Sequence, residues 1–364
     1  MTGCVDHPPP GYERSLTSVT ADDAPRTARA PLIPKPVKRI AAWLAFALVV
    51  EYLVIPQIAG TRKAIHLLGR VNPLYLLAGF GLEAASIVAY GQLTRSVLPR
   101  RDPEHPSPSL WTIIRIQLAT LGLSHTVPGG AAAGTSLSYR LLTDAGVDGT
   151  DAGFALATQG LGSAVVLNAI LWLALVVSIP VTGFNPLYLT VALIGAVLLT
   201  AFALVVFLLT RGEQRAAAML GRLTGRLPLV NGWAVERFVH RLAARLRELA
   251  ADRPLMARAV GWAAANWLLD AGSLWVFVRA FGGHVGPVAL LVSYGLANVL
   301  AAIPITPGGL GIIEGVLTSS LVGFGTARGI AILGVLSWRL VNFWLPIPVG
   351  GASYVSFKVA PPHT

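Results

Sequence analysis

Residues 303–314 read IPITPGGLGIIE, and the Pro-Gly-Gly in this stretch breaks a long apolar segment. A second Pro-Gly-Gly, at residues 128–130, breaks an apolar segment in the first half of the chain. Backbone groups freed by such breaks are tolerated at membrane depth only where protein or a polar cavity covers them. Paired breaks in two halves of a membrane chain are typical of transporter binding sites. The repeat therefore predicts two broken helices around a polar site, the alternative being chance in a chain with 38 glycines and 25 prolines.

The composition indicates an integral membrane protein. Of the 364 residues, 54% are hydrophobic and only 12% are charged, and several apolar runs approach the length of a membrane span. The single cysteine, Cys4, allows neither a disulfide within the chain nor a thiolate metal site. The seven histidines are scattered along the sequence. We therefore expect no metal and no cofactor.

The location of the net positive charge, which totals +11, indicates how the chain is oriented in the membrane. Residues 211–258 hold ten arginines against four acidic residues, and a basic loop of this kind lies on the cytoplasmic side. Apolar residues recur at helical spacing within residues 234–249. They predict an amphipathic helix that lies in the inner interface or, equally, packs on the protein as a solvated helix. The charge therefore predicts no nucleic-acid partner.

The chain divides into a polar start, a membrane part and a short end. Residues 1–38 are polar and proline-rich and predict a disordered cytoplasmic tail, residues 39–355 a polytopic transmembrane domain, and residues 356–364 a C-terminal tail. Full spans are expected at residues 40–59, 72–93, 152–179, 187–210, 259–281 and 329–349. The two broken pairs are expected at residues 111–127 with 131–142 and 287–306 with 310–323.

Charge along the chain predicts how these segments cross the plasma membrane. If each broken pair is a re-entrant hairpin, both termini and the loop at residues 211–258 lie in the cytoplasm. Counting the first pair as one crossing would place the basic loop outside. Whether the second pair re-enters or spans stays open. The predicted fold is an all-α polytopic helical bundle with two Pro-Gly-Gly broken or re-entrant hairpins in an inverted-repeat arrangement.

Five ionisable residues lie deep in apolar segments, namely Glu51, Glu83, Asp270, Glu314 and Arg339. A charge near the bilayer centre costs roughly 2.5–3.5 kcal/mol on insertion scales. These residues should therefore face the bundle interior, where they pair or are neutral. For Arg339 two roles remain open, pairing with one of the carboxylates or holding an anionic headgroup with its planar fork.

The breaks and the charges together define the candidate site. A half-helix that begins after Gly309 would point its positive end at an anion, either Glu314 itself or a lipid phosphate. Arg140 follows the first break, either as a substrate contact or as an interfacial anchor. The candidate substrate-binding residues are Arg339, Glu314, Arg140, Asp270, Glu83, Pro307, Gly308, Gly309, Pro128, Gly129 and Gly130.

The stretch at residues 303–314, followed about 25 residues later by Arg339, resembles the C-terminal signature of the lysylphosphatidylglycerol synthase transmembrane, or flippase, family. Residues 127–130 with residues 138–142 resemble it more loosely. The resemblance covers residues from about 40 to 355 and implies a protein that moves anionic or aminoacylated phospholipids, or other lipid-linked substrates, between leaflets. It implies functional roles for Pro307, Gly308, Gly309, Glu314 and Arg339, and less securely for Arg140.

Two departures from the family pattern stand out. Residues 131–136, after the first break, contain no acidic residue. The sequence also carries no aminoacyl-transferase domain after its membrane part, so we expect it not to make lysylphosphatidylglycerol itself.

These observations predict a lipid flippase-like transporter whose partners are membrane lipids with anionic headgroups. We expect no enzyme, because the sequence contains no P-loop, no G-x-S-x-G and no H-E-x-x-H motif. The alternative is a non-transporting membrane partner or regulator of a cell-envelope lipid biosynthetic enzyme.

Overall fold

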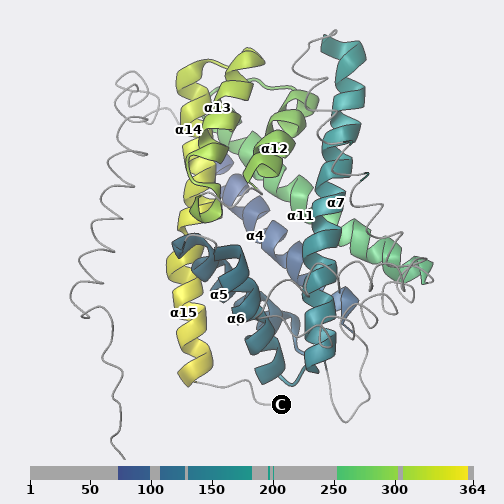
Figure 1. The fold of residues 1–364 in the computed structure, drawn as a ribbon. Coiled ribbons are helices and arrows are strands. Elements are labelled where there is room, and N and C mark those ends of the chain that lie inside the picture. Colours follow the sequence, from purple (N-terminus) through teal and green to yellow (C-terminus); the bar gives the residue numbers. More distant parts are fainter. Residues whose placement is uncertain are drawn as a thin grey trace, which may run out of the picture. The chain divides into compact units, whose positions relative to one another are not determined.

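The computed structural model describes residues 73–98, 107–127, 130–182, 252–301 and 306–359, together with Ala196 and Thr200. These residues fall within one unit of the chain, residues 56–364, and every element in the described ranges is helical (Figure 1). The predicted tail, the spans at residues 40–59 and 187–210, most of the basic loop, and Pro128 with Gly129 lie outside the described residues.

Three described helices are long and apolar enough to cross a membrane. They are α4 (Pro73–Val97), α7 (Gly149–Thr182), and a continuous helix from Arg328 to Val359 made of α14 (Arg328–Arg339), a π-helical turn η3 (Leu340–Trp344) and α15 (Pro346–Val359). The predicted spans at residues 72–93 and 152–179 are confirmed as such helices. The last helix extends ten residues beyond the predicted end at residue 349.

Helix α11 (Arg253–Ala280) replaces the predicted span at residues 259–281, but it is not among the three long apolar helices. The helix packs along α4. Ser86 of α4 donates to both oxygens of Asn266 at 3.1 Å, and Ser273 donates to the carbonyl of Gly79 at 2.8 Å. These buried bonds fix α11 against α4.

The first broken pair consists of α5 (Leu110–Thr126) and α6 (Gly130–Asp144), which pack against each other. Their bounds agree with the predicted halves to within two residues. A Cβ placed on Gly134 would lie 3.1 Å from the side chain of Thr120, so the absence of a side chain there lets α6 approach α5 closely.

The second broken pair consists of α12 (Pro287–Ala301), the short turn η2 (Pro307–Gly309) and α13 (Ile312–Gly323). Gly308, Gly309 and Gly311 have φ angles of 53°, 70° and 82°, a region that residues with a Cβ avoid. Because Gly311 still has this conformation, α13 begins at Ile312, two residues later than the predicted start at Leu310. The three glycines therefore allow the backbone conformation that interrupts the helix.

The two breaks lie against each other. The turn η2 contacts α5 and α6 as well as α12, although α5 and α6 lie in the lower part of Figure 1 and α12 and α13 in the upper part. One apolar core surrounds α5 and α6, with Ile113, Ile116 and Leu142 fully buried. A second surrounds α11 to α14, with Leu274 and Leu317 fully buried. The polar residues described next come from elements of both regions.

Candidate functional site

A buried ion pair joins the second break to the long C-terminal helix. Arg339 Nε donates to Glu314 Oε1 at 2.5 Å, and Arg339 Nη2 donates to the carbonyl of Gly308 at 3.1 Å. The two residues are 2% and 5% exposed. The guanidinium also lies over the ring of Phe343, 4.3 Å from its centroid. Of the roles open to Arg339, the structure therefore contains the pairing with Glu314.

The local sequence explains why Glu314 points at this arginine. Glu314 is the third residue of α13, and its Oε2 accepts the N–H of Gly311 at 2.7 Å. This bond is the carboxylate half of a capping box, and it places the negative charge at the positive end of the half-helix. The left-handed turn at Gly308 leaves its carbonyl free to accept from Arg339. Glu314 itself is thus the anion at this helix end.

Arg339 ends α14, and the helix widens directly after it. The N–H of Leu345 donates to the carbonyl of Leu340 at 2.9 Å, which is the five-residue bond of a π-helix. Such turns inside α-helices occur frequently at functional sites. The π-helical turn contains Phe343, which contacts Arg339, and Asn342, which belongs to a second polar cluster.

This second cluster is centred on Asp270 of α11. Asp270 Oδ2 accepts from the hydroxyl of Tyr294 at 2.6 Å, and Asp270 Oδ1 accepts from the indole N–H of Trp338 at 2.6 Å. Asn342 Nδ2 lies 3.3 Å from Oδ1 and donates to Glu83 Oε1 at 2.9 Å. Four helical elements besides α11 thus meet at two neighbouring carboxylates, the candidate residues Glu83 and Asp270.

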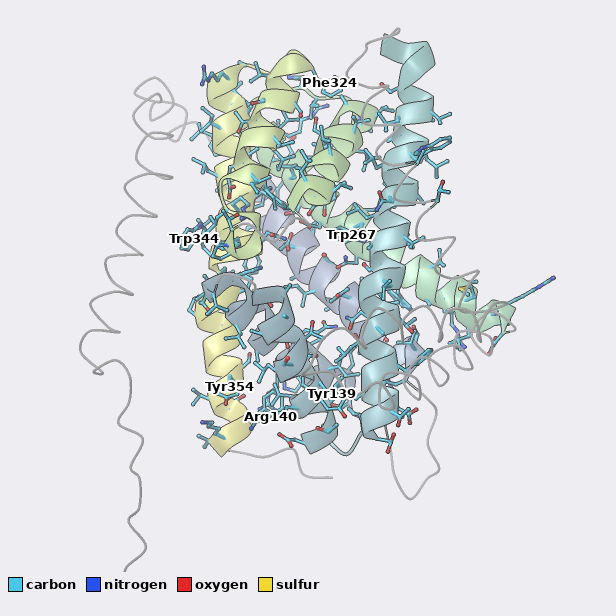
Figure 2. All side chains as sticks on the ribbon, in the orientation of Figure 1. Tyr139, Arg140, Trp267, Phe324, Trp344 and Tyr354 are labelled. Carbon is cyan, nitrogen blue, oxygen red and sulfur yellow. The ribbon has the colours of Figure 1, made fainter. Side chains whose placement is uncertain are left out.

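A cavity of about 350 Å³ opens beside these carboxylates. Its wall is mostly apolar surface with polar side chains set into it, and none of the described residues that line it is lysine or arginine. Trp267, labelled in Figure 2, forms part of the wall. The lining residues are Glu83, Ser86, Ile87, Tyr90, Gln117, Leu121, His125, Gly160, Ser163, Ala164, Leu167, Asn266, Trp267, Asp270, Asn298, Asn342 and Pro346.

His125 connects the first break to the second. Its Nδ1 donates to the carbonyl of Phe343 at 3.0 Å, because a carbonyl can only accept, and its ring stacks on Phe343 with centroids 4.3 Å apart. A Cβ on Gly308 would lie 3.0 Å from His125 Cδ2, so the two breaks touch here. The sequence signal for this residue is its place three residues before Pro128.

Not every candidate residue joins these clusters. Arg140 is exposed on α6 and lies near its lower end in Figure 2, beside Tyr139. It takes part in neither cluster. Gly130 is buried at the start of α6, while Pro128 and Gly129 lie outside the described residues. Sequence reasoning missed Tyr294 and Trp338, which carry no signal that separates them from the other aromatic residues of membrane helices.

Comparison with known proteins agrees with the membrane architecture. The family described as lysylphosphatidylglycerol synthase TM region matches residues 40–350, a range that includes both breaks and Arg339. A UPF0104 membrane protein of Methanothermobacter thermautotrophicus is 22% identical over 317 residues, which cover 82% of this chain and 90% of that protein. Another from the same organism is 23% identical over 331 residues, 85% of this chain and 91% of that protein.

Proposed function

The chain belongs to the lysylphosphatidylglycerol synthase transmembrane family, and from this membership we propose that it is a lipid flippase-like transporter. It moves an anionic or aminoacylated phospholipid, or another lipid-linked substrate, from one leaflet of the plasma membrane to the other. The headgroup passes through the protein while the acyl chains stay in the bilayer. The protein carries out no covalent chemistry on the lipid.

The observation that carries this proposal is the polar cavity among apolar helices. Buried carboxylates and amides are costly in a membrane protein, and they mark pathways for polar substrates. The cavity of about 350 Å³ has the size and the mixture of apolar and polar wall that small-molecule sites require. It lies beside the two breaks, where transporter sites are expected.

The ion pair supplies a movable connection within this proposal. Arg339 holds the second break to the C-terminal helix through Glu314 and Gly308. When the two elements separate during transport, Arg339 is released and attracts the phosphate of the headgroup, because its fork matches phosphate oxygens. Glu83 and Asp270 balance charge in the cavity. The substrate thereby competes with Glu314 for one guanidinium.

The proposed topology follows the charge pattern. Both termini and the loop at residues 211–258 lie in the cytoplasm, and the two broken pairs act as hairpins that enter from opposite faces. The contact between η2 and the first broken pair supports this arrangement, since hairpins that enter from opposite sides would meet at their tips.

The test is leaflet-resolved transport of fluorescently labelled phospholipids in liposomes that hold the purified protein. A membrane-impermeant quencher reports the fraction of each lipid in the outer leaflet. Wild-type protein should equilibrate at least one lipid class faster than empty liposomes. Arg339→Ala and Glu314→Gln should slow this transport at equal folded amounts, whereas Arg258→Ala, at an exposed arginine of α11, serves as the control.

Three outcomes would contradict the proposal. Unchanged transport in both ion-pair variants refutes the role given to Arg339 and Glu314. Absence of transport by the pure protein, with stable co-purification of an envelope enzyme, supports the regulator instead. A change in the mass of the added lipid indicates an intramembrane enzyme.

A further inference from the structure

Three polar atoms in the cavity wall have no hydrogen-bond partner among the described residues. They are Glu83 Oε2, Gln117 Oε1 and Ser163 Oγ, and their residues are 4%, 6% and 3% exposed. Nearly all buried polar atoms in proteins have a partner, so these three atoms call for a partner from the cavity, either water or a ligand group. The three come from three helices, α4, α5 and α7, and therefore offer separate points of attachment.

The hydrogen bond that Gln117 makes with Thr94 determines whether its free atom donates or accepts. The hydroxyl of Thr94 donates to the carbonyl of Tyr90 at 3.2 Å, so its oxygen can only accept from Gln117. Gln117 must therefore present its Nε2, which donates to Thr94 Oγ1 at 2.9 Å. The amide oxygen therefore remains an acceptor without a partner among the described residues. A ligand that meets it has to donate a hydrogen bond.

Ser163 differs from an ordinary serine in a helix. Such a hydroxyl commonly donates to the carbonyl four residues earlier, as Ser293 does to Ala289 at 2.8 Å. Ser163 makes no such bond, and its backbone carbonyl instead accepts the indole N–H of Trp267 at 2.9 Å. That bond fixes the Trp267 ring in the wall. The hydroxyl can both donate to and accept from a ligand.

The charge of the wall argues against a phosphate in the cavity. The described lining residues include two carboxylates and no lysine or arginine, and Arg339 is committed to Glu314 and Gly308 outside this wall. An ammonium headgroup carries all its hydrogen-bond donors on a single nitrogen atom. The free acceptors here are spread over three helices and two of them are neutral. Donors spread over a larger uncharged group match this arrangement better.

We propose that the cavity binds an uncharged polyhydroxyl headgroup, a glycosyl unit carried on a lipid. Its hydroxyls donate to Gln117 Oε1, Glu83 Oε2 and Ser163 Oγ, and its apolar ring face packs on Trp267, whose own N–H is already used. This inference rests on the proposed transport function. It assigns the glycosyl unit to the cavity and leaves the phosphate of the lipid, where there is one, to Arg339 outside the cavity wall.

The test is equilibrium binding to the full chain in phosphatidylcholine nanodiscs. The probe is tritiated dioctanoyl glucosylglycerol, and the competitors carry the same chains with a phosphate, a lysyl ester or a free hydroxyl as headgroup. The glucosyl lipid should bind at least about tenfold more tightly than each competitor. Gln117→Leu and Ser163→Ala should each weaken its binding about two- to tenfold, the loss expected for one hydrogen bond.

Two glycines of α7 give a matched pair of variants. Gly160 lines the cavity, whereas Gly162 does not, and a Cβ on either would meet no atom within 4 Å. Gly160→Leu should weaken binding of the glucosyl lipid at least about tenfold by placing a side chain in the cavity, and Gly162→Leu should leave it unchanged. Both variants should fold, since each replaces glycine by a good helix former in open space.

The result separates this inference from the transport proposal. Tighter binding of the phosphate or lysyl probe, or unchanged glucosyl affinity in Gly160→Leu, overturns the glycosyl assignment even if the protein transports another lipid. Glucosyl binding that responds to Gly160→Leu supports the assignment even if reconstituted protein moves no lipid, and the transport proposal alone then fails.

Discussion

Breaking the ion pair between Arg339 and Glu314 should destabilise the protein far more than removing both charges together. Leucine at either position leaves the other charge buried without its partner, which costs about 3–5 kcal/mol. Arg339→Leu also loses the contact over Phe343, at 4.3 Å, worth about 0.5–2 kcal/mol. Glu314→Leu leaves the guanidinium with the carbonyl of Gly308 alone. We expect each single variant to lose about 4 kcal/mol of stability.

The double variant, with leucine at both positions, contains no buried charge at this place. Replacing a buried pair by apolar residues is often neutral or stabilising. The double variant should therefore lose less stability than either single variant, although it also forfeits the bond from Gly311 to Glu314. The prediction concerns the sign of the coupling, which does not depend on the size assigned to any one contact.

The measurement is reversible unfolding of the purified protein by dodecyl sulfate in mixed micelles, followed by circular dichroism. Arg140→Leu is the control, because this arginine is exposed and belongs to neither cluster. Single variants that match Arg140→Leu, or a double variant whose loss equals the sum of both single losses, would refute the reasoning that a buried, mutually dependent pair holds the break.

Three further outcomes follow from the same structure. Tyr294→Phe removes the 2.6 Å bond to a buried carboxylate and should cost about 1.5–3 kcal/mol in the same unfolding assay; a loss below that of exposed substitutions would contradict it. Gly308→Ala, at φ 53° and against neighbouring rings, should cost about 1–3 kcal/mol, whereas Gly315→Ala in open space should be neutral, and equal effects would disprove the strain. In a Cys4→Ser background, Ala217→Cys in whole cells should resist a membrane-impermeant thiol reagent until the cells are opened; labelling from outside would reverse the proposed topology.

The sequence was sufficient to locate the breaks and their charges. Charged residues in apolar segments must pair, be neutral or face the bundle interior, and this rule singled out Glu83, Asp270, Glu314 and Arg339, although it left the partner of Arg339 open. The glycines after Pro307 likewise mark the break, because only they adopt the required backbone angles. Both predictions depend on energetic costs, of an unpaired charge in the membrane and of a positive φ angle, that apply wherever the residue lies in the fold.

Other parts of the site could not be predicted from the sequence. Tyr294 and Trp338 lie 24 and 68 residues from Asp270, and nothing in their neighbourhoods separates them from other membrane aromatics. For Arg140, which follows the first break, the sequence left a substrate contact and an interfacial anchor open, and in the structure this arginine is exposed. This exposure comes from helix packing, which the hydrophobic pattern does not encode. The cavity likewise depends on how at least five helices pack around it, which the sequence pattern does not specify.

The π-helical turn after Arg339 determines the directions in which side chains on either side of it leave the long C-terminal helix. In a regular α-helix, residues three apart share one face. The wider turn at Leu340–Trp344 separates their directions, so that Arg339 meets the second break while Asn342 meets the carboxylates Glu83 and Asp270. The spacing here lets Asn342 join Trp338 at the second cluster, while Arg339 between them contacts the second break.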